Sequence, residues 1–213
     1  MAIPATGLQH KVMPALVAVF AQETDRLNAL DAQLGDGDHG LSMQTGLRAL
    51  LALTESSPDQ SLESFLREGG TAFNEAAGST IGILVMSALK AAGQSVAGKD
   101  TLDVGDAADM LEAAISAIMA RGKAKPGQKT ILDSLMPAVE ALRRCAGGPD
   151  QHPPVAEQVS DAAKSGAEGT VELTSSTGRA RWFKDRSIGI MDPGAWSGYL
   201  IMKTVGETVG DAA

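Results

Sequence analysis

The chain has 213 residues, of which 18 are basic and 26 are acidic, so its formal net charge is −8. Such an acidic chain lacks the basic face that binding to nucleic acid requires, and no run of about 20 apolar residues predicts a membrane-spanning helix. The single cysteine, Cys145, excludes an intrachain disulfide, and the start of the chain has no leader-like pattern, which together favour a cytoplasmic protein.

Hydrophobic residues make up 44% of the chain but aromatic residues only 3%. In an alanine-rich chain this balance favours packed helices, because sheets rely on aromatic and β-branched side chains. Apolar residues at three-to-four spacing predict eight helices, over residues 12–31, 41 to a stop at 56–58, 62–77, 81–92, 103–121, 130–145, 155–167 and 197–209. The fourth helix is apolar on most sides and is expected to be central, and Pro137 predicts a kink or break in the sixth. The pattern predicts an all-α protein with a single domain over residues 1–213.

The 24 glycines need a separate explanation in a helical chain. They are expected between helices, where the backbone turns sharply or approaches a ligand. The irregular stretch 174–193 is longer than most loops of compact domains, which indicates a functional loop. Trp182 and Trp196 flank an Asp-Pro-Gly turn in this region and are expected to pack it against the protein.

The sharpest chemical feature is an acidic, glycine-rich segment between the first two predicted helices. Asp31, Asp36 and Asp38 lie within eight residues, and the glycines between them let a short backbone fold around a small hard cation. Carboxylates with few other protein ligands suit Mg²⁺, which proteins commonly share with substrate phosphates. The helix that begins near His39 would direct amide groups at those phosphates. A solvated acidic turn is the alternative interpretation.

Three common motifs match the sequence only in letters. Residues 35–40 fit the dinucleotide-binding pattern G-x-G-x-x-G, but a predicted helix precedes them where a strand is required. An EF-hand loop that starts at Asp36 would place Gly40 and Leu47 at two ligand positions. The basic stretch 122–130 has one residue too many for a Walker A loop and also follows no strand, so we interpret it as an inter-helix loop in which Thr130 caps the next helix.

Two further segments carry groups that suit phosphate. Ser79 and Thr80 stand at the start of the fourth predicted helix, where hydroxyl groups either cap the helix or bind an anion. Arg179 lies in the long irregular stretch, and a planar guanidinium can make paired hydrogen bonds to phosphate. A surface salt bridge is the alternative role for this arginine.

Taken together, these segments resemble the nucleotide-binding subunits of dihydroxyacetone kinases. The likeness rests on the sequences LDAQLGDGDHG, GQKTILDSLMP, GRA and RSIGIMDPG, at residues 30–40, 127–137, 178–180 and 186–194. The resemblance implies an eight-helix barrel whose loops at one end bind ADP or ATP with two Mg²⁺ ions. One departure is the run Thr80-Ile81-Gly82-Ile83, where the family commonly has Gly-Ser-Gly-Pro.

The resemblance also implies roles for individual residues. The metal ligands would be Asp31, Asp36 and Asp38. The nucleotide would be contacted by His39, Gly40, Leu41, Ser42, Ser79, Thr80, Gly122, Ile131, Arg179, Asp192, Pro193 and Gly194. In this assignment Gly122 and Ile131 border the adenine, Arg179 reaches the phosphates, and residues 192–194 close over the nucleoside.

The activity implied is phosphoryl transfer to a small C3 or C4 ketose, which in this family is held by a separate subunit or domain. Metal ions held by aspartates neutralise charge without a protein nucleophile, so we expect a phosphotransferase that is active only with its partner subunit. The donor is either free ATP or a phosphohistidine carrier of the phosphotransferase system, and a homodimer is left open. The alternative function is a nucleotide- or metal-sensing module that acts on a regulatory protein.

Overall fold

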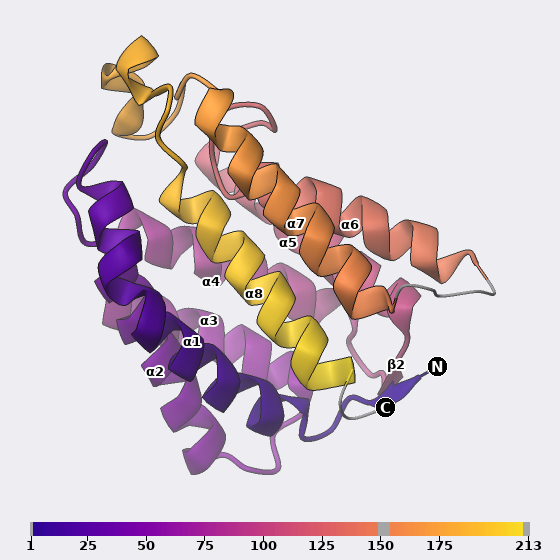
Figure 1. Ribbon diagram of the computed structural model, residues 1–213. Helices are drawn as coiled ribbons and strands as arrows, with labels where there is room; N and C mark the ends of the chain where they lie inside the picture. The colour runs from indigo at the N-terminus through magenta and orange to yellow at the C-terminus, as the bar shows by residue number, and fades with distance from the viewer. Residues whose placement is uncertain (1, 149–153, 211–213) are drawn as a thin grey trace.

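The computed structural model describes residues 2–148 and 154–210, and eight α-helices dominate this part of the chain (Figure 1). They are α1 (Leu8–Asp31), α2 (His39–Ser56), α3 (Leu62–Ala77), α4 (Thr80–Ser95), α5 (Val104–Gly122), α6 (Leu132–Ala146), α7 (Val155–Gly169) and α8 (Pro193–Gly210). Two short strands, β1 (Ile3–Pro4) and β2 (Thr101–Leu102), pair antiparallel. The all-α prediction is confirmed, and strands of two residues are too short to produce a periodic signal.

The start of α8 differs most usefully from the prediction. The helix begins at Pro193, four residues before the predicted start, because proline has a helix-compatible φ and the first turn needs no N–H from it. The Asp192 Oδ1 accepts a hydrogen bond of 2.7 Å from the Ala195 amide, as a helix cap does. The predicted turn at residues 192–194 is therefore a helix start. Pro137 does not end α6, which continues across it.

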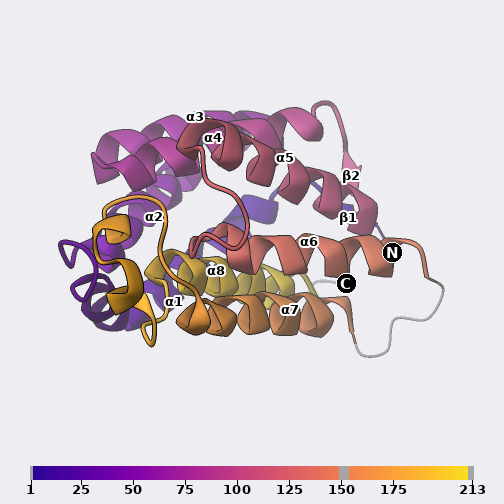
Figure 2. The same ribbon diagram turned by 90° about the horizontal axis from the view of Figure 1, so that it is seen from above.

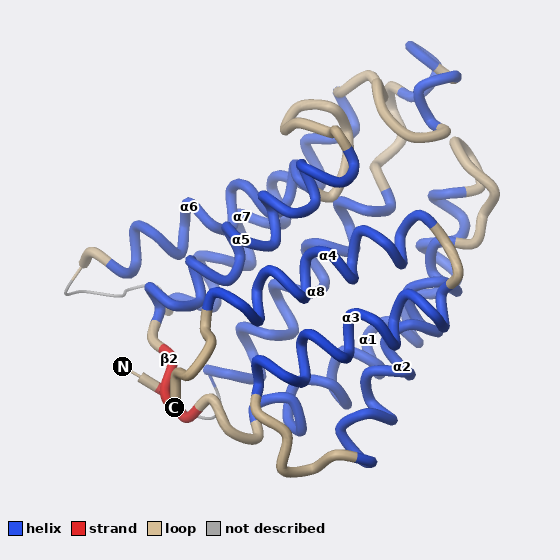
Figure 3. Tube along the Cα trace, turned by 180° about the vertical axis from the view of Figure 1, so that it is seen from behind, coloured by secondary structure: helices blue, strands red, loops and turns tan. Residues whose placement is uncertain are grey.

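The helices close into a ring. Each packs against the next along the chain, and α8 packs back against α1 (Figures 1 and 2). The chain therefore runs up and down around the ring, so the connections α1–α2, α3–α4, α5–α6 and α7–α8 lie at one end. The chain termini and the β1–β2 pair lie at the other end, as Figure 3 shows from behind. This topology gathers the four predicted functional segments at one end of the barrel.

The apolar stripes of the helices form two clusters. The first joins α1, α2, α3 and α8 and includes the fully buried Phe20, Leu27 and Phe73. The second joins α5, α6 and α7 and includes Leu132 and Ala163. Burial of aromatic and aliphatic side chains in both clusters is the main favourable term for closing the ring.

Helix α4 is not central, which corrects the prediction. Its apolar side chains are mostly half-buried, and its buried residues are Gly82, Ala92 and Gly93. The reason is that a closed ring has no central element, so α4 packs between α3 and α5 like any other member. No helix in residues 2–148 or 154–210, α4 included, is long and apolar enough to cross a membrane.

Several glycines lie inside helices, where two helices approach closely. A Cβ on Gly46 would lie 2.4 Å from the Phe73 ring, and a Cβ on Gly166 would lie 2.1 Å from the Asp133 carbonyl oxygen. Both distances are far below a van der Waals contact. The expectation that the glycines lie between helices is therefore only partly correct, because some are needed at helix crossings.

Candidate functional site

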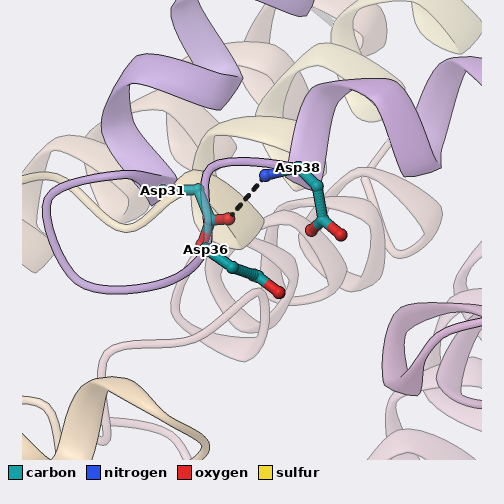
Figure 4. Close-up of side chains that lie close together, drawn as sticks. All are labelled: Asp31, Asp36 and Asp38. Atoms are coloured by element: carbon teal, nitrogen blue, oxygen red, sulfur yellow. Dashed lines mark hydrogen bonds between the residues drawn. The ribbon is translucent and has the colours of Figure 1, made fainter.

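Three carboxylates gather in the α1–α2 connection (Figure 4). One oxygen from each of Asp31, Asp36 and Asp38 lies within 4.8 Å of the others. The Asp31 Oδ2 also accepts hydrogen bonds from the Gly37 amide at 2.8 Å and the Asp38 amide at 3.1 Å. The carboxylate at the end of α1 thus organises the loop that presents the other two. Three hard oxygen donors this close together form a set that Mg²⁺ prefers.

Two glycines allow the loop to close this tightly. A Cβ on Gly35 would lie 2.3 Å from the Asp31 Oδ1, so any side chain there would displace the carboxylate. Gly37 has a φ of +77°, a left-handed conformation that other residues adopt at a cost. The loop sequence and the position of Asp31 are therefore interdependent.

Two carboxyl groups of the cluster have opposite pKa shifts. The Arg179 guanidinium donates a hydrogen bond to Asp36 and lowers the pKa of that carboxyl group. The pKa of Asp38 is raised, first by burial and then by the negative charges of Asp36 and Asp31. One arginine does not balance three carboxylates, so the cluster keeps an excess of negative charge that a divalent cation would neutralise.

The first amide groups of α2 are hydrogen-bonded to a residue that was not predicted to belong to the site. The Asn28 Oδ1 accepts hydrogen bonds from the Gly40 amide at 2.8 Å and the Leu41 amide at 3.2 Å. A Cβ on Gly40 would lie 2.3 Å from the Thr24 carbonyl oxygen, so α2 begins in close contact with α1. The Ser42 amide donates to the Asp38 carbonyl oxygen within the helix turn. The spacing of Asn28 and Asp31, one helical turn apart, is the signal that could have identified this residue.

His39 connects α2 to α8. Its imidazole is buried, and Nε2 lies 2.8 Å from the Ser197 Oγ in a hydrogen bond. Burial lowers the pKa of His39 to about 4, so the ring is neutral at neutral pH. A neutral imidazole can donate one hydrogen bond and accept one, which suits a positioned polar group.

The α3–α4 connection supplies the two predicted hydroxyl groups. The Ser79 Oγ accepts a hydrogen bond from the Gly82 amide at 3.4 Å, so Ser79 acts as the helix cap, one of the two roles considered. Thr80 is the first residue of α4 and is exposed. Both residues lie at the same end of the ring as the aspartates.

The α5–α6 connection meets the start of α8. A Cβ on Gly194 would lie 3.5 Å from the Ile131 amide nitrogen, and a Cβ on Gly198 would lie 3.1 Å from the Ile131 Cγ1. The structure thus brings Ile131 close to Gly194 at the start of α8. Gly122 ends α5, where a Cβ would lie 3.3 Å from the Leu84 Cδ2 of α4.

The two tryptophans differ in environment. Trp196 is buried, and its Nε1 donates a hydrogen bond of 3.0 Å to the Glu23 Oε2 of α1. Trp182 is 71% exposed in the 3₁₀ turn Ala180–Trp182 of the α7–α8 loop. The expectation that both pack the loop against the protein is therefore wrong for Trp182.

Several known proteins are similar to this chain. The DAK2 domain matches residues 33–207 of the chain. The chain is 31% identical to the ADP-binding subunit DhaL of the PEP-dependent dihydroxyacetone kinase of Escherichia coli, over 87% of this chain and 88% of that subunit. It is 32% identical to the ADP-binding subunit DhaL of dihydroxyacetone kinase 2 of Listeria innocua, over 93% of this chain and 92% of that subunit.

The chain spans about a third of the longer kinases that it matches. It is 35% identical to the L-erythrulose 1-kinase of Mycolicibacterium smegmatis, over 92% of this chain and 34% of that kinase. The crystal structure of the dihydroxyacetone kinase from C. freundii in complex with AMP-PNP and Mg²⁺ has a TM-score of 0.75 and 25% identity. That match covers 96% of this chain and 34% of the solved chain.

Proposed function

The chain belongs to the DAK2 domain family, and we propose that it binds a Mg-nucleotide and passes a phosphoryl group to a small ketose on a partner kinase subunit. The observation that carries the proposal is the cluster of Asp31, Asp36 and Asp38, with one oxygen of each within 4.8 Å of the others. Arg179 reaches this cluster from the α7–α8 loop, and the start of α2 adjoins it. Cations beside a helix start suit the phosphates of a nucleotide.

The extent of the matches supports the nucleotide-binding role. The ADP-binding subunits are matched over 88% and 92% of their lengths, whereas the erythrulose kinase is matched over 34%. The common part is therefore the part that corresponds to ADP-binding subunits, which supports assigning nucleotide binding to this chain and ketose binding to a partner. We also propose that residues 1–213 form one nucleotide-binding domain.

The donor set fits Mg²⁺. Three carboxylates offer six oxygens, and Mg²⁺ usually takes only one or two carboxylates from the protein, so we assign two ions to Asp31, Asp36 and Asp38. Bound Mg²⁺ would neutralise the charge that the transferred phosphoryl group spreads over its oxygens. The chain itself supplies no nucleophile in this proposal. Its residues bind and orient the nucleotide.

The remaining residues divide between phosphate and nucleoside. Arg179 and the residues at the starts of α2 and α4 surround the phosphates in this assignment: His39, Gly40, Leu41, Ser42, Ser79 and Thr80. Ile131 and Gly122 border the adenine. Asp192, Pro193 and Gly194 close over the nucleoside, a placement that the contact of Gly194 with Ile131 supports.

The partner subunit would dock at the same end of the ring. Exposed apolar side chains lie there at the start of α2 and in the α7–α8 loop: Leu41, Trp182 and Ile188. Apolar groups exposed beside a reaction site suit contact with another protein. In the same proposal, the bound nucleotide is either recharged by a phosphohistidine carrier of the phosphotransferase system or exchanged with free ATP. The location proposed is the cytoplasm, and both a monomer and a homodimer are compatible with this function.

Calorimetry and a coupled assay test the proposal. ADP should bind the isolated chain only in the presence of Mg²⁺, and the double variant Asp36→Ala/Asp38→Ala should lose this binding. Asp109→Ala, which removes an exposed carboxylate on α5, is the matched control. Dihydroxyacetone should be phosphorylated only when the ketose-binding subunit is added. Turnover by the isolated chain would contradict the division of labour, and nucleotide-dependent binding to a regulatory protein without phosphoryl transfer would favour the sensing module.

A further inference from the structure

One buried side chain at the site has no place in the proposed function. Lys129, in the α5–α6 connection, is 2% exposed and has a φ of +62°. Its Nζ donates hydrogen bonds to the carbonyl oxygens of Thr170 at 2.5 Å, Leu173 at 3.1 Å and Ile190 at 2.5 Å. An ammonium group has three N–H donors, so these bonds use all of them. This lysine is therefore not available to phosphate, and the basic loop expected here is partly buried.

The three carbonyl groups belong to the two ends of one loop. Thr170 and Leu173 follow the end of α7, and Ile190 stands shortly before α8. We call residues 170–173 and 189–190 the neck of the α7–α8 loop. The Gly189 amide also donates to the Val171 carbonyl oxygen across this neck, at 2.8 Å. The part of the loop beyond the neck carries Arg179.

The neck also touches the start of α8. The Thr170 Oγ1 accepts a hydrogen bond of 3.0 Å from the Asp192 amide and donates one of 2.6 Å to the Ala167 carbonyl oxygen. Thr170 thus accepts a hydrogen bond from Lys129 at its carbonyl oxygen and another from the Asp192 amide at its hydroxyl group. A shift of the Lys129 ammonium group would therefore move both ends of the loop.

Opposing effects act on the charge of the buried ammonium group. Burial lowers the pKa of Lys129, whereas the nearby carboxylates of Asp192 and Asp133 act in the opposite direction. Three carbonyl dipoles directed at one nitrogen supply further stabilisation. A neutral side chain of similar size would leave three carbonyl groups at the neck without their donor, and unpaired buried acceptors are costly.

We propose that Lys129 is a positioning residue whose ammonium group fastens the neck of the α7–α8 loop and thereby places Arg179 and Asp192 at the nucleotide site. The effect on the loop is independent of the proposed function. The effect on nucleotide binding rests on that function. The two parts can therefore be tested separately.

Hydrogen exchange measured by mass spectrometry tests the effect on the loop. In Lys129→Met, amides in peptides from residues 170–192 should exchange about tenfold faster than in the unaltered chain, because the neck opens more often. Exchange in α3 should change much less, which distinguishes loosening of the loop from general destabilisation. Lys203→Met, which removes an exposed lysine paired with Glu207 in α8, is the matched control. Equal exchange in residues 170–192 of all three proteins would overturn the proposal.

Chemical rescue tests the role of the ammonium group. Lys129→Ala removes the four atoms that propylammonium can replace, so propylammonium should restore slow exchange in residues 170–192. Tetramethylammonium, a cation without N–H donors, should not. Rescue by both cations or by neither would contradict the three hydrogen bonds. If neither variant folds, Lys129→Arg keeps the charge but cannot direct three donors from one nitrogen, and unchanged exchange in that variant would overturn the proposal.

Binding of Mg-ADP tests the link to the site. The affinity should fall about tenfold in Lys129→Met and recover with propylammonium in Lys129→Ala, an effect that corresponds to about 1.4 kcal/mol. Unchanged affinity alongside faster loop exchange would overturn the placement of Arg179 and Asp192. If the unaltered chain binds no Mg-ADP, the proposed function fails, while faster loop exchange would still support the role of Lys129 at the neck.

Discussion

The Arg179 guanidinium donates a hydrogen bond to the Asp36 carboxylate, although the two residues are 143 positions apart in the chain. A residue that we assign to phosphate thus contacts one that we assign to metal. Both side chains are largely exposed, so the pair contributes no more than about 1 kcal/mol to stability. Because the interaction is this weak, we expect Arg179 to exchange it for contacts with the phosphates when a nucleotide binds.

Asp38→Asn should make the chain more stable and its nucleotide binding weaker. The pKa of Asp38 is raised by burial and by its acidic neighbours, so removing its charge relieves repulsion in the ligand-free protein. We expect the Tm without Mg²⁺ to rise by about 1 °C and the Mg-ADP affinity to fall at least about tenfold. Thermal shift with and without Mg-ADP measures both, and a lower Tm in the ligand-free variant would argue against repulsion in the cluster.

Asn28→Ala should lower the stability of the chain without weakening its nucleotide binding. The variant loses the acceptor for the Gly40 and Leu41 amides, which should lower the free energy of unfolding by about 1 kcal/mol. If these amides turn to the phosphates when a nucleotide binds, the Mg-ADP affinity should stay the same or rise. Urea denaturation and calorimetry give the two quantities. A loss of affinity together with the loss of stability would instead assign Asn28 itself to the nucleotide site.

Asp192 should make stability fall as the pH rises. Burial raises the pKa of this carboxyl group to about 7, well above its ordinary value near 4. Between these two values the folded chain binds a proton that the unfolded chain does not, so this contribution to stability is present at low pH and is lost as the pH rises through 7.

The variant Asp192→Asn isolates this contribution. Asparagine also accepts the cap hydrogen bond from the Ala195 amide, so the helix start is kept. Between pH 5 and pH 8 the Tm of the unaltered chain should fall by roughly 5 °C or more relative to the Tm of the variant. A difference that does not change with pH would show that Asp192 is ionised throughout this range.

Two glycines of α7 should respond in opposite directions to alanine. A Cβ on Gly166 would lie 2.1 Å from the Asp133 carbonyl oxygen of α6, so Gly166→Ala should lower the free energy of unfolding by about 2 kcal/mol. A Cβ on Gly169 would meet nothing within 4 Å, and its backbone is helical, so Gly169→Ala should be neutral or stabilising by up to about 1 kcal/mol. Urea denaturation compares them, and similar effects of the two changes would contradict the close α6–α7 crossing.

Local sequence patterns were sufficient to predict much of the protein. Helix α3 has the predicted bounds, because helix periodicity, a serine cap and a terminal glycine agree over one short segment. Asp31, Asp36 and Asp38 cluster as expected, since eight residues with intervening glycines can bring carboxylates together without help from the rest of the chain. The position of Trp182, the place of α4 and the glycines inside helices were not predicted correctly, because each depends on which neighbour packs against it.

The helices, their order and the acidic loop could thus be predicted from local patterns, because they depend on residues within a few turns of one another. The contacts between groups that are distant in the chain depend instead on how the helices pack. The contact of His39 with Ser197 spans 158 residues, and the bonds of Lys129 to the loop neck span 41 to 61. Such contacts follow from closure of the ring between α1 and α8, which brings all odd-to-even connections to one end. No local pattern encodes that closure, since it depends on the burial of apolar surface along all eight described helices at once.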